Sequence, residues 1–146
     1  MIRWRFRTYV SSSGRNDVQD CVDALEVDAQ VKFAVELKYL AVSLPSEWHE
    51  PRARKLRGHE GLFEIRFKAG KVQQRPIGFF GPGPAEFTIL VWATHKQNVY
   101  QPAKALATAD ARRKAVLGGT ALTAPLTIDG EDVPPDEESE SASGLR

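Results

Sequence analysis

Cationic side chains occur at alternating positions in the second half of the sequence, where two neighbouring segments have the pattern of β-strands. Arg66 and Lys68 would project from one face of a strand over residues 62–68, and Arg75 from a strand over residues 71–80. Outward side chains on adjacent antiparallel strands lie within about 5 Å of each other. The cations can therefore converge on one anionic group, together with three polar residues that follow the next strand: His95, Lys96 and Tyr100.

These residue types suit the cleavage of an RNA phosphodiester. That reaction needs a base for the 2′-hydroxyl, an acid for the leaving 5′-oxygen and positive charge for the pentavalent phosphorane. Arginine and lysine supply such charge without a metal, and histidine, here His95, is the side-chain type that titrates near neutral pH. An ordinary solvated face of a sheet would carry the same charges, so the pattern alone leaves both interpretations open.

Motifs for metals, cofactors and phosphate loops are absent from the sequence. No two of His49, His59 and His95 have the i, i+4 spacing of a helical zinc site. Residues 81–84 alternate glycine with proline, which leaves too few backbone donors for a phosphate. Cys21 is the single cysteine, which excludes an internal disulfide, and its place on the apolar stripe of an expected helix predicts a core residue. We therefore expect no metal and no cofactor.

Charge is distributed unevenly around a net value of +1. Residues 119–146 contain seven acids and one base, which leaves 19 bases and 12 acids in residues 1–118. A basic body attracts polyanions, although the same charge also serves solubility. The acidic segment could compete with RNA for the basic body or simply aid solubility, and we favour solubility.

No part of the sequence predicts export or membrane insertion. The apolar runs are much shorter than a bilayer span. Arginines interrupt the N-terminal residues, where a signal peptide needs a continuous apolar stretch. The unpaired cysteine fits a reducing compartment. We therefore expect a cytoplasmic protein without a membrane partner.

Hydrophobic periodicity predicts helices near the N-terminus. Residues 2–10 alternate as a strand, and residues 16–25 and 28–44 have the helical spacing of a hairpin. Asn16 and Asp28 have the side chains of N-caps for these two helices.

Three further strands, over residues 62–68, 71–80 and 86–94, are joined by short turns and so predict an antiparallel meander. Pro76 lacks a backbone N–H, which predicts a bulge or a local loss of pairing in the second of these strands. Pro102 suits the first turn of a last helix. The expected fold is α+β, with an N-terminal strand and a helical hairpin packed on a twisted four-stranded sheet and a C-terminal helix.

Residues 1–118 are predicted to form this domain. Residues 119–146 are rich in proline, serine and acids, and we expect disorder from about Thr123. The irregular connection between the hairpin and the meander adds four cations, which we expect to contact nucleic acid: Arg52, Arg54, Lys55 and Arg57.

Residues 62–68, Leu-Phe-Glu-Ile-Arg-Phe-Lys, resemble a segment of the RelE/ParE toxin superfamily, in particular its phage-associated, HigB-like branch, which has the form Leu-aromatic-Glu-(Leu/Ile)-Arg. Residues 55–58, Lys-Leu-Arg-Gly, resemble the basic stretch that precedes it. Residues 75–80, Arg-Pro-Ile-Gly-Phe-Phe, resemble the strand that follows, and residues 92–97 resemble the turn that leads to a proline-started helix, here at Pro102.

The resemblance covers roughly Val18 to Val116. It implies a type II toxin-antitoxin toxin of RelE-like fold, which cleaves mRNA at the ribosome without a metal. A neighbouring gene would encode its antitoxin, for which we expect a helix-turn-helix protein.

The same resemblance implies roles for particular residues. Arg66 and Arg75 match sheet arginines that handle phosphate, and His95 and Lys96 fall where relatives place catalytic or RNA-contacting groups. Contacts to RNA are also expected from Lys68 and Tyr100.

Two other functions stay open. One is a ParE-like toxin that binds gyrase and has no nuclease chemistry, against which His95 and the sheet arginines argue. The other is a phage-derived or prophage-derived binding protein that keeps the fold without activity. Pro76 and Gly78 favour it, because they stand where relatives carry aromatic or branched residues.

Overall fold

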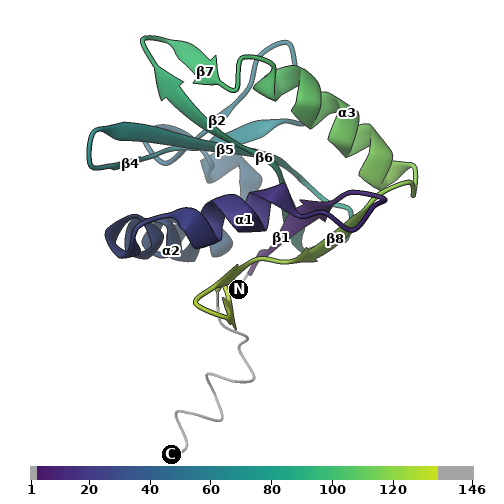
Figure 1. Ribbon diagram of the computed structural model, residues 1–146, viewed down its shortest axis with the longest axis horizontal. Helices are drawn as coiled ribbons and strands as arrows, with labels where there is room; N and C mark the ends of the chain where they lie inside the picture. The colour runs from purple at the N-terminus through teal and green to yellow at the C-terminus, as the bar shows by residue number, and fades with distance from the viewer. Residues whose placement is uncertain (1–2, 135–146) are drawn as a thin grey trace, which may run out of the picture.

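The computed structural model describes residues 3–134 (Figure 1). Its helices are α1 (Asp17–Ala24), α2 (Val27–Ala41) and α3 (Ala105–Leu117), with a 3-10 helix at Pro45–Glu47. Its strands are β1 (Arg5–Val10), β2 (Ala53–Lys55), β3 (Phe63–Ile65), β4 (Phe67–Ala69), β5 (Val72–Phe80), β6 (Glu86–Lys96), β7 (Val99–Gln101), β8 (Leu122–Pro125), β9 (Thr127–Ile128) and β10 (Glu131–Asp132).

One large sheet runs in the order β2-β3-β5-β6-β1-β8, with β4 also paired to β5 and β7 to β6. β1 is parallel to β6, and the other neighbours in this sheet are antiparallel. The α+β class and the central antiparallel meander are confirmed. The sheet is wider than the four strands we expected, because β2, β7 and β8 extend it.

The strand predicted over residues 62–68 is divided into β3 and β4, both paired to β5. The ladder is interrupted beside Pro76, as its missing N–H predicts. The pairing register is the same on both sides of the interruption, since Glu64 pairs with Ile77 and Phe67 with Gln74. This register places Arg66 level with Arg75.

Helices cover the sheet on two sides, α1 and α2 on one and α3 on the other (Figure 1). One side packs against α1 and α2 through a core that includes Phe6, Phe33, Leu37, Ile65 and Phe87. The other side packs against α3 through a second core, whose members include Leu62, Ile77, Phe79, Ala93 and Ala109. No helix within residues 3–134 has the length and apolar character to cross a bilayer.

The start of each N-terminal helix can be compared with its predicted cap. Asn16 caps α1, because its side chain accepts a hydrogen bond from the backbone N–H of Gln19 at 2.9 Å. The prediction for Asp28 is wrong: α2 begins earlier, and this carboxylate lies in its first turn, where it complements the helix dipole. The prediction of a core Cys21 is also wrong, because α1 turns Val18 and Val22 inward and leaves the thiol exposed.

The last helix begins at Ala105, three residues after Pro102. The prediction that Pro102 lies in the first turn of this helix is therefore wrong. The residues before Pro102 form a β-hairpin in which β7 pairs with the end of β6. Its turn residues, Gln97 and Asn98, both have positive φ, which is the geometry of a type I′ turn.

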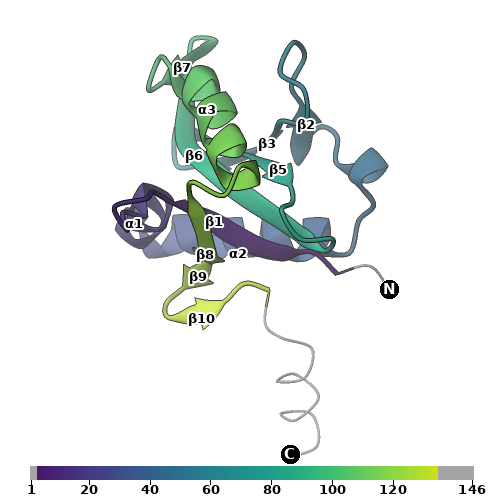
Figure 2. The ribbon, with the colours of Figure 1, turned by 90° about the vertical axis from the view of Figure 1, so that its right-hand side faces the viewer.

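The expectation of disorder from about Thr123 is wrong for residues 123–134. β8 pairs antiparallel with β1 (Figure 2). Leu126 is fully buried in the core that packs against α1 and α2. The side chain of Gln19 accepts a hydrogen bond from the backbone N–H of Thr127 and donates one to its carbonyl oxygen. The ordered domain therefore extends beyond residue 118, whereas residues 135–146 of the predicted tail lie outside the described residues.

The burial of Leu126 makes the C-terminal segment a contributor to stability. We expect Leu126→Ala to lower the free energy of unfolding by about 2–5 kcal/mol, because it removes a fully buried side chain. Leu122→Ala, on a side chain in β8 that is 68% exposed, should change it by less than about 0.5 kcal/mol. Urea unfolding measures both, and equal small effects would contradict the integration of this segment into the core.

Candidate functional site

The face of the sheet that packs against α3 also carries polar side chains beside its apolar layer. We call Glu64, Arg75 and His95 the polar row. Because side chains two residues apart on a strand share a face, Glu64 lies on the same face as Leu62, and Arg75 on the same face as Ile77; both apolar residues pack in the α3 core. His95 is likewise two residues from Ala93. The part of this face beyond α3 therefore carries charged and titratable groups in place of a core.

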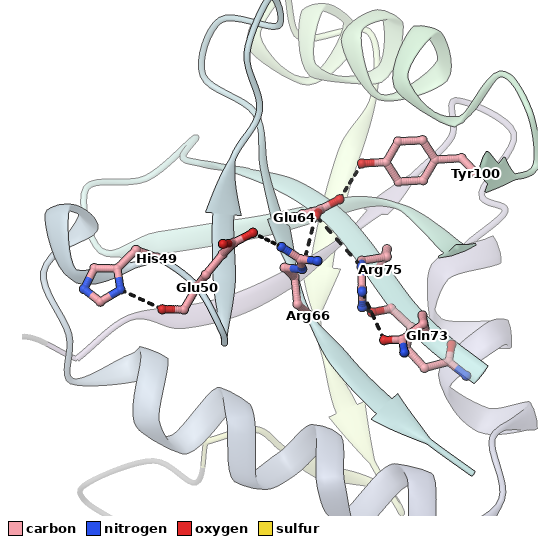
Figure 3. Close-up of polar contacts among 8 residues, drawn as sticks. His49, Glu50, Glu64, Arg66, Gln73, Arg75 and Tyr100 are labelled. Atoms are coloured by element: carbon pink, nitrogen blue, oxygen red, sulfur yellow. Dashed lines mark hydrogen bonds and ion pairs between the residues drawn. The ribbon is translucent and has the colours of Figure 1, made fainter. Parts of the chain in front are cut away.

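The carboxylate of Glu64 is the centre of this row (Figure 3). Glu64 is only 4% exposed. The Tyr100 hydroxyl donates a hydrogen bond to its Oε1, while its Oε2 lies 3.6 Å from Nε of Arg66 and 3.9 Å from Nε of Arg75. The sequence predicts no role for Glu64. Glu64 holds Tyr100 and the two arginines in place, and this role is visible only in the folded structure, because Tyr100 is 36 residues away in the sequence.

The guanidinium of Arg75 is buried as well, at 5% exposure of the residue. It donates to the Gln74 carbonyl oxygen at 2.8 Å and to Oε1 of Gln73 at 3.1 Å, whereas its Nε has no hydrogen-bond partner in the described residues. Burial and the neighbouring charge of Arg66 lower the pKa of Arg75, and the Glu64 carboxylate opposes this effect. The site therefore holds two adjacent guanidiniums beside one buried carboxylate.

Arg66 is more accessible and has a second anionic partner. Its Nη1 donates to the carboxylate of Glu50, which lies just before β2 and is largely exposed (Figure 3). A cleft of about 390 Å³ opens at this pair. Its walls are formed by Glu50, Pro51, Arg66, Phe67, Lys68, Gln73 and Arg75.

A second cleft, of about 790 Å³, shares Glu50 with the first. Three of the cations expected to bind nucleic acid line it: Arg54, Lys55 and Arg57. The β2–β3 register sets Arg54 opposite Glu64, so this arginine also joins the polar row. Glu50 therefore stands between two clefts that both have basic walls.

The β6–β7 hairpin brings His95 and Tyr100 together. They are paired in register, and their ring centroids are 4.9 Å apart. Burial raises the pKa of Tyr100, and the hydrogen bond to Glu64 raises it further. Tyr100 therefore stays a protonated donor at physiological pH. His95 is also opposite Gln73 on β5, which places the imidazole on the same face as Arg75.

Two residues predicted for the site lie elsewhere. Arg52 donates to Glu36 of α2 at 2.8 Å, and its guanidinium lies 3.7 Å from the centroid of the Tyr39 ring. Lys96 is exposed, and alternation along β6 places it on the face opposite His95. The structure thus separates Arg52 and Lys96 from the other predicted residues. Around Glu64 and the two clefts it gathers Arg54, Lys55, Arg57, Arg66, Lys68, Arg75, His95 and Tyr100.

Comparisons with known proteins add no assignment, since no protein-family model, no curated protein and no solved structure matches this chain. Within residues 3–134, no three His, Cys, Asp or Glu side chains are grouped so that they could hold a metal ion.

The Tyr100–Glu64 hydrogen bond predicts a pH-dependent stability. We expect Tyr100→Phe to cost about 1.5–3 kcal/mol at pH 8, because a buried carboxylate loses a donor. The Tyr100 proton is held more tightly in the folded state, so its contribution is complete below about pH 10, the pKa of an unfolded tyrosine, and is lost as pH rises toward the higher folded value.

Urea unfolding at pH 8 and at pH 11 tests this expectation. The difference between wild type and Tyr100→Phe should shrink at the higher pH. Tyr39→Phe is the control, because the hydroxyl of Tyr39 makes no hydrogen bond to the residues described. A difference that stays constant or grows with pH would be inconsistent with a neutral phenol bound to Glu64.

Proposed function

We propose that this protein is a metal-independent endoribonuclease of the RelE-like toxin type, which cleaves mRNA at the ribosome and is neutralised by an antitoxin. The observation that supports this proposal most is the pair of guanidiniums, Arg66 and Arg75, held on Glu64 at the wall of an open cleft with His95 on the same face. Such an arrangement presents positive charge to one phosphate and supplies a group for proton transfer.

The reaction proceeds by attack of the 2′-oxygen on the adjacent phosphorus. The P–O5′ bond breaks, which gives a 2′,3′-cyclic phosphate and a 5′-hydroxyl, with one proton removed from the 2′-hydroxyl and one added to the 5′-oxygen. Arg66 and Arg75 stabilise the charge of the phosphorane. His95 accepts the proton of the 2′-hydroxyl, and solvent water donates the proton that the 5′-oxygen gains. Glu64 and Tyr100 act as positioning residues that hold the arginines.

The second cleft supports the binding of a longer strand. Arg54, Lys55 and Arg57 line it on one side of Glu50, and Lys68 lines the first cleft on the other side. These cations can contact successive phosphates of a single-stranded RNA that lies across both clefts. The affinity of such binding falls steeply as the salt concentration rises.

The sequence features that favoured an inactive protein have structural explanations. A Cβ at Gly78 would lie 2.2 Å from the carbonyl oxygen of Thr88, so packing requires glycine there. Pro76 lies where the β-ladder is interrupted. Neither residue lines the cleft beside Arg66, and their presence is compatible with a working site.

Arg66 provides the sharpest test of the nuclease. Arg66→Gln should lower the rate of RNA cleavage by about 10²–10³-fold, because one cation of the transition state is lost. Cleavage of a labelled single-stranded RNA with EDTA present, and primer extension on cellular mRNA after expression, measure the effect. Arg15→Gln, which removes the same charge from an exposed position, should leave cleavage unchanged.

His95→Gln separates chemistry from binding in the same assay. It should reduce cleavage and leave RNA affinity close to wild type, whereas Arg66→Gln should reduce both. Growth arrest that persists in the double variant Arg66→Gln with Arg75→Gln, without mRNA cleavage in the wild type, would contradict the nuclease and favour a protein-binding toxin.

Glu50 should compete with RNA phosphate for Arg66. An exposed ion pair contributes up to about 1 kcal/mol, so Glu50→Gln should lower the dissociation constant for single-stranded RNA by up to about fivefold at low salt. Glu26→Gln changes the net charge equally but lies at the start of α2, and it should have a smaller effect. Fluorescence anisotropy measures both, and equal effects would mean that only net charge matters.

A further inference from the structure

The outer face of α2 carries an apolar stripe, which we define as Val27, Val31, Val35 and Tyr39 together with the C-cap residue Val42. These side chains are 45–72% exposed. The first four recur every four residues and so lie on one face along the whole helix. Single exposed apolar residues are normal on a protein surface, whereas a contiguous apolar patch marks an interaction site.

The opposite face of α2 is already used by the fold. Ala29, Phe33, Leu37 and Leu40 are buried there against the sheet. α2 is therefore apolar on two opposite faces, a pattern typical of helices that are covered on both sides. Valine is also a poorer helix former than alanine or lysine, so neither local helix stability nor the core of this domain accounts for the stripe.

Charges within the stripe differ between its two ends. At 100° per residue, Asp28 near the N-terminal end and Lys38 near the C-terminal end both fall within the arc of the stripe. Neither side chain forms an ion pair or hydrogen bond within residues 3–134. The other two charges on the helix are engaged elsewhere: Lys32 donates to the Lys68 carbonyl oxygen, and Glu36 accepts from Arg52.

We propose that this stripe is the interface of an antiparallel, two-fold homodimer in which α2 packs against α2 of a second copy. An acidic end and a basic end make the stripe complementary to itself only when the helices run in opposite directions. Asp28 is then level with the partner's Lys38, and the two-fold axis repeats this pair. The same register sets Val31 level with the partner's Val35, and Val27 level with the partner's Tyr39.

This interface does not depend on the proposed nuclease. α2 covers one side of the sheet, and the polar row around Glu64 lies on the other side, next to α3. The stripe faces away from the sheet, and none of its residues lines the cleft beside Arg66.

Sedimentation equilibrium on the full chain tests the dimer. Wild type should approach twice the monomer mass of 16.2 kDa as its concentration rises. Val31→Glu combined with Val35→Glu should keep the chain monomeric, while Leu117→Glu, at an exposed position outside the stripe, should dimerise like wild type. Circular dichroism checks that each variant is folded. A wild type that stays monomeric at every concentration would leave the stripe to a different protein and overturn the proposal.

Charge reversal tests the antiparallel register. Asp28→Lys places two like-charged pairs in the homodimer, and Lys38→Asp does the same. The dimer dissociation constant of each variant alone should therefore be at least about tenfold higher than that of wild type. An equimolar mixture of the two variants restores both opposite-charge pairs and should recover the dimer mass. Dimers that are unaffected by either reversal, or a mixture that stays monomeric, would overturn this arrangement.

Discussion

The burial of one carboxylate is the constraint on which the candidate site depends. A charged group at 4% exposure is unfavourable unless opposite charges and hydrogen bonds compensate it. Glu64 receives this compensation from the Tyr100 hydroxyl on one oxygen and from the Arg66 and Arg75 guanidiniums beside the other. These partners come from β7, from the break after β3 and from β5, so satisfying a single side chain ties three parts of the sheet together and orients the arginines.

The two arginines are neighbours because the pairing register with β5 is the same on both sides of the interruption. Pro76 has no N–H to donate, and the pairing of β3 and β4 with β5 is lost beside it while the register is kept. Arg66 and Arg75 consequently lie level with each other. Two guanidiniums in this position repel, which lowers the pKa of Arg75 beyond the effect of its burial, and the Glu64 carboxylate offsets that repulsion. An anion that enters the cleft would also offset the repulsion between the two guanidiniums.

The helices cover the two sides of the sheet unequally, so one side is buried and the other is partly open to solvent. α1 and α2 bury one side, whereas α3 covers only part of the other and leaves the polar row beside a cleft. The hairpin of β6 and β7 extends this open part, because its type I′ turn returns Tyr100 next to His95. On the far side, the outer face of α2 remains apolar and largely exposed, although Arg52 lies over Tyr39 near its C-terminal end.

Local patterns in the sequence determined the helices and strands of the α+β class, the cap at Asn16, the interruption at Pro76 and the side of its own strand on which each of Arg66 and Arg75 lies. Each of these depends on neighbouring residues alone. Tertiary structure decided the burial of Glu64, the separation of Arg52 and Lys96 from the site, and the order of residues 123–134. In each case the partner is distant: Tyr100 lies 36 residues from Glu64, and β8 pairs with β1 across nearly the whole domain. Periodicity indicates on which face of its own helix or strand a residue lies. The burial, separation and ordering described above depend instead on which distant segment packs against that face in the folded protein.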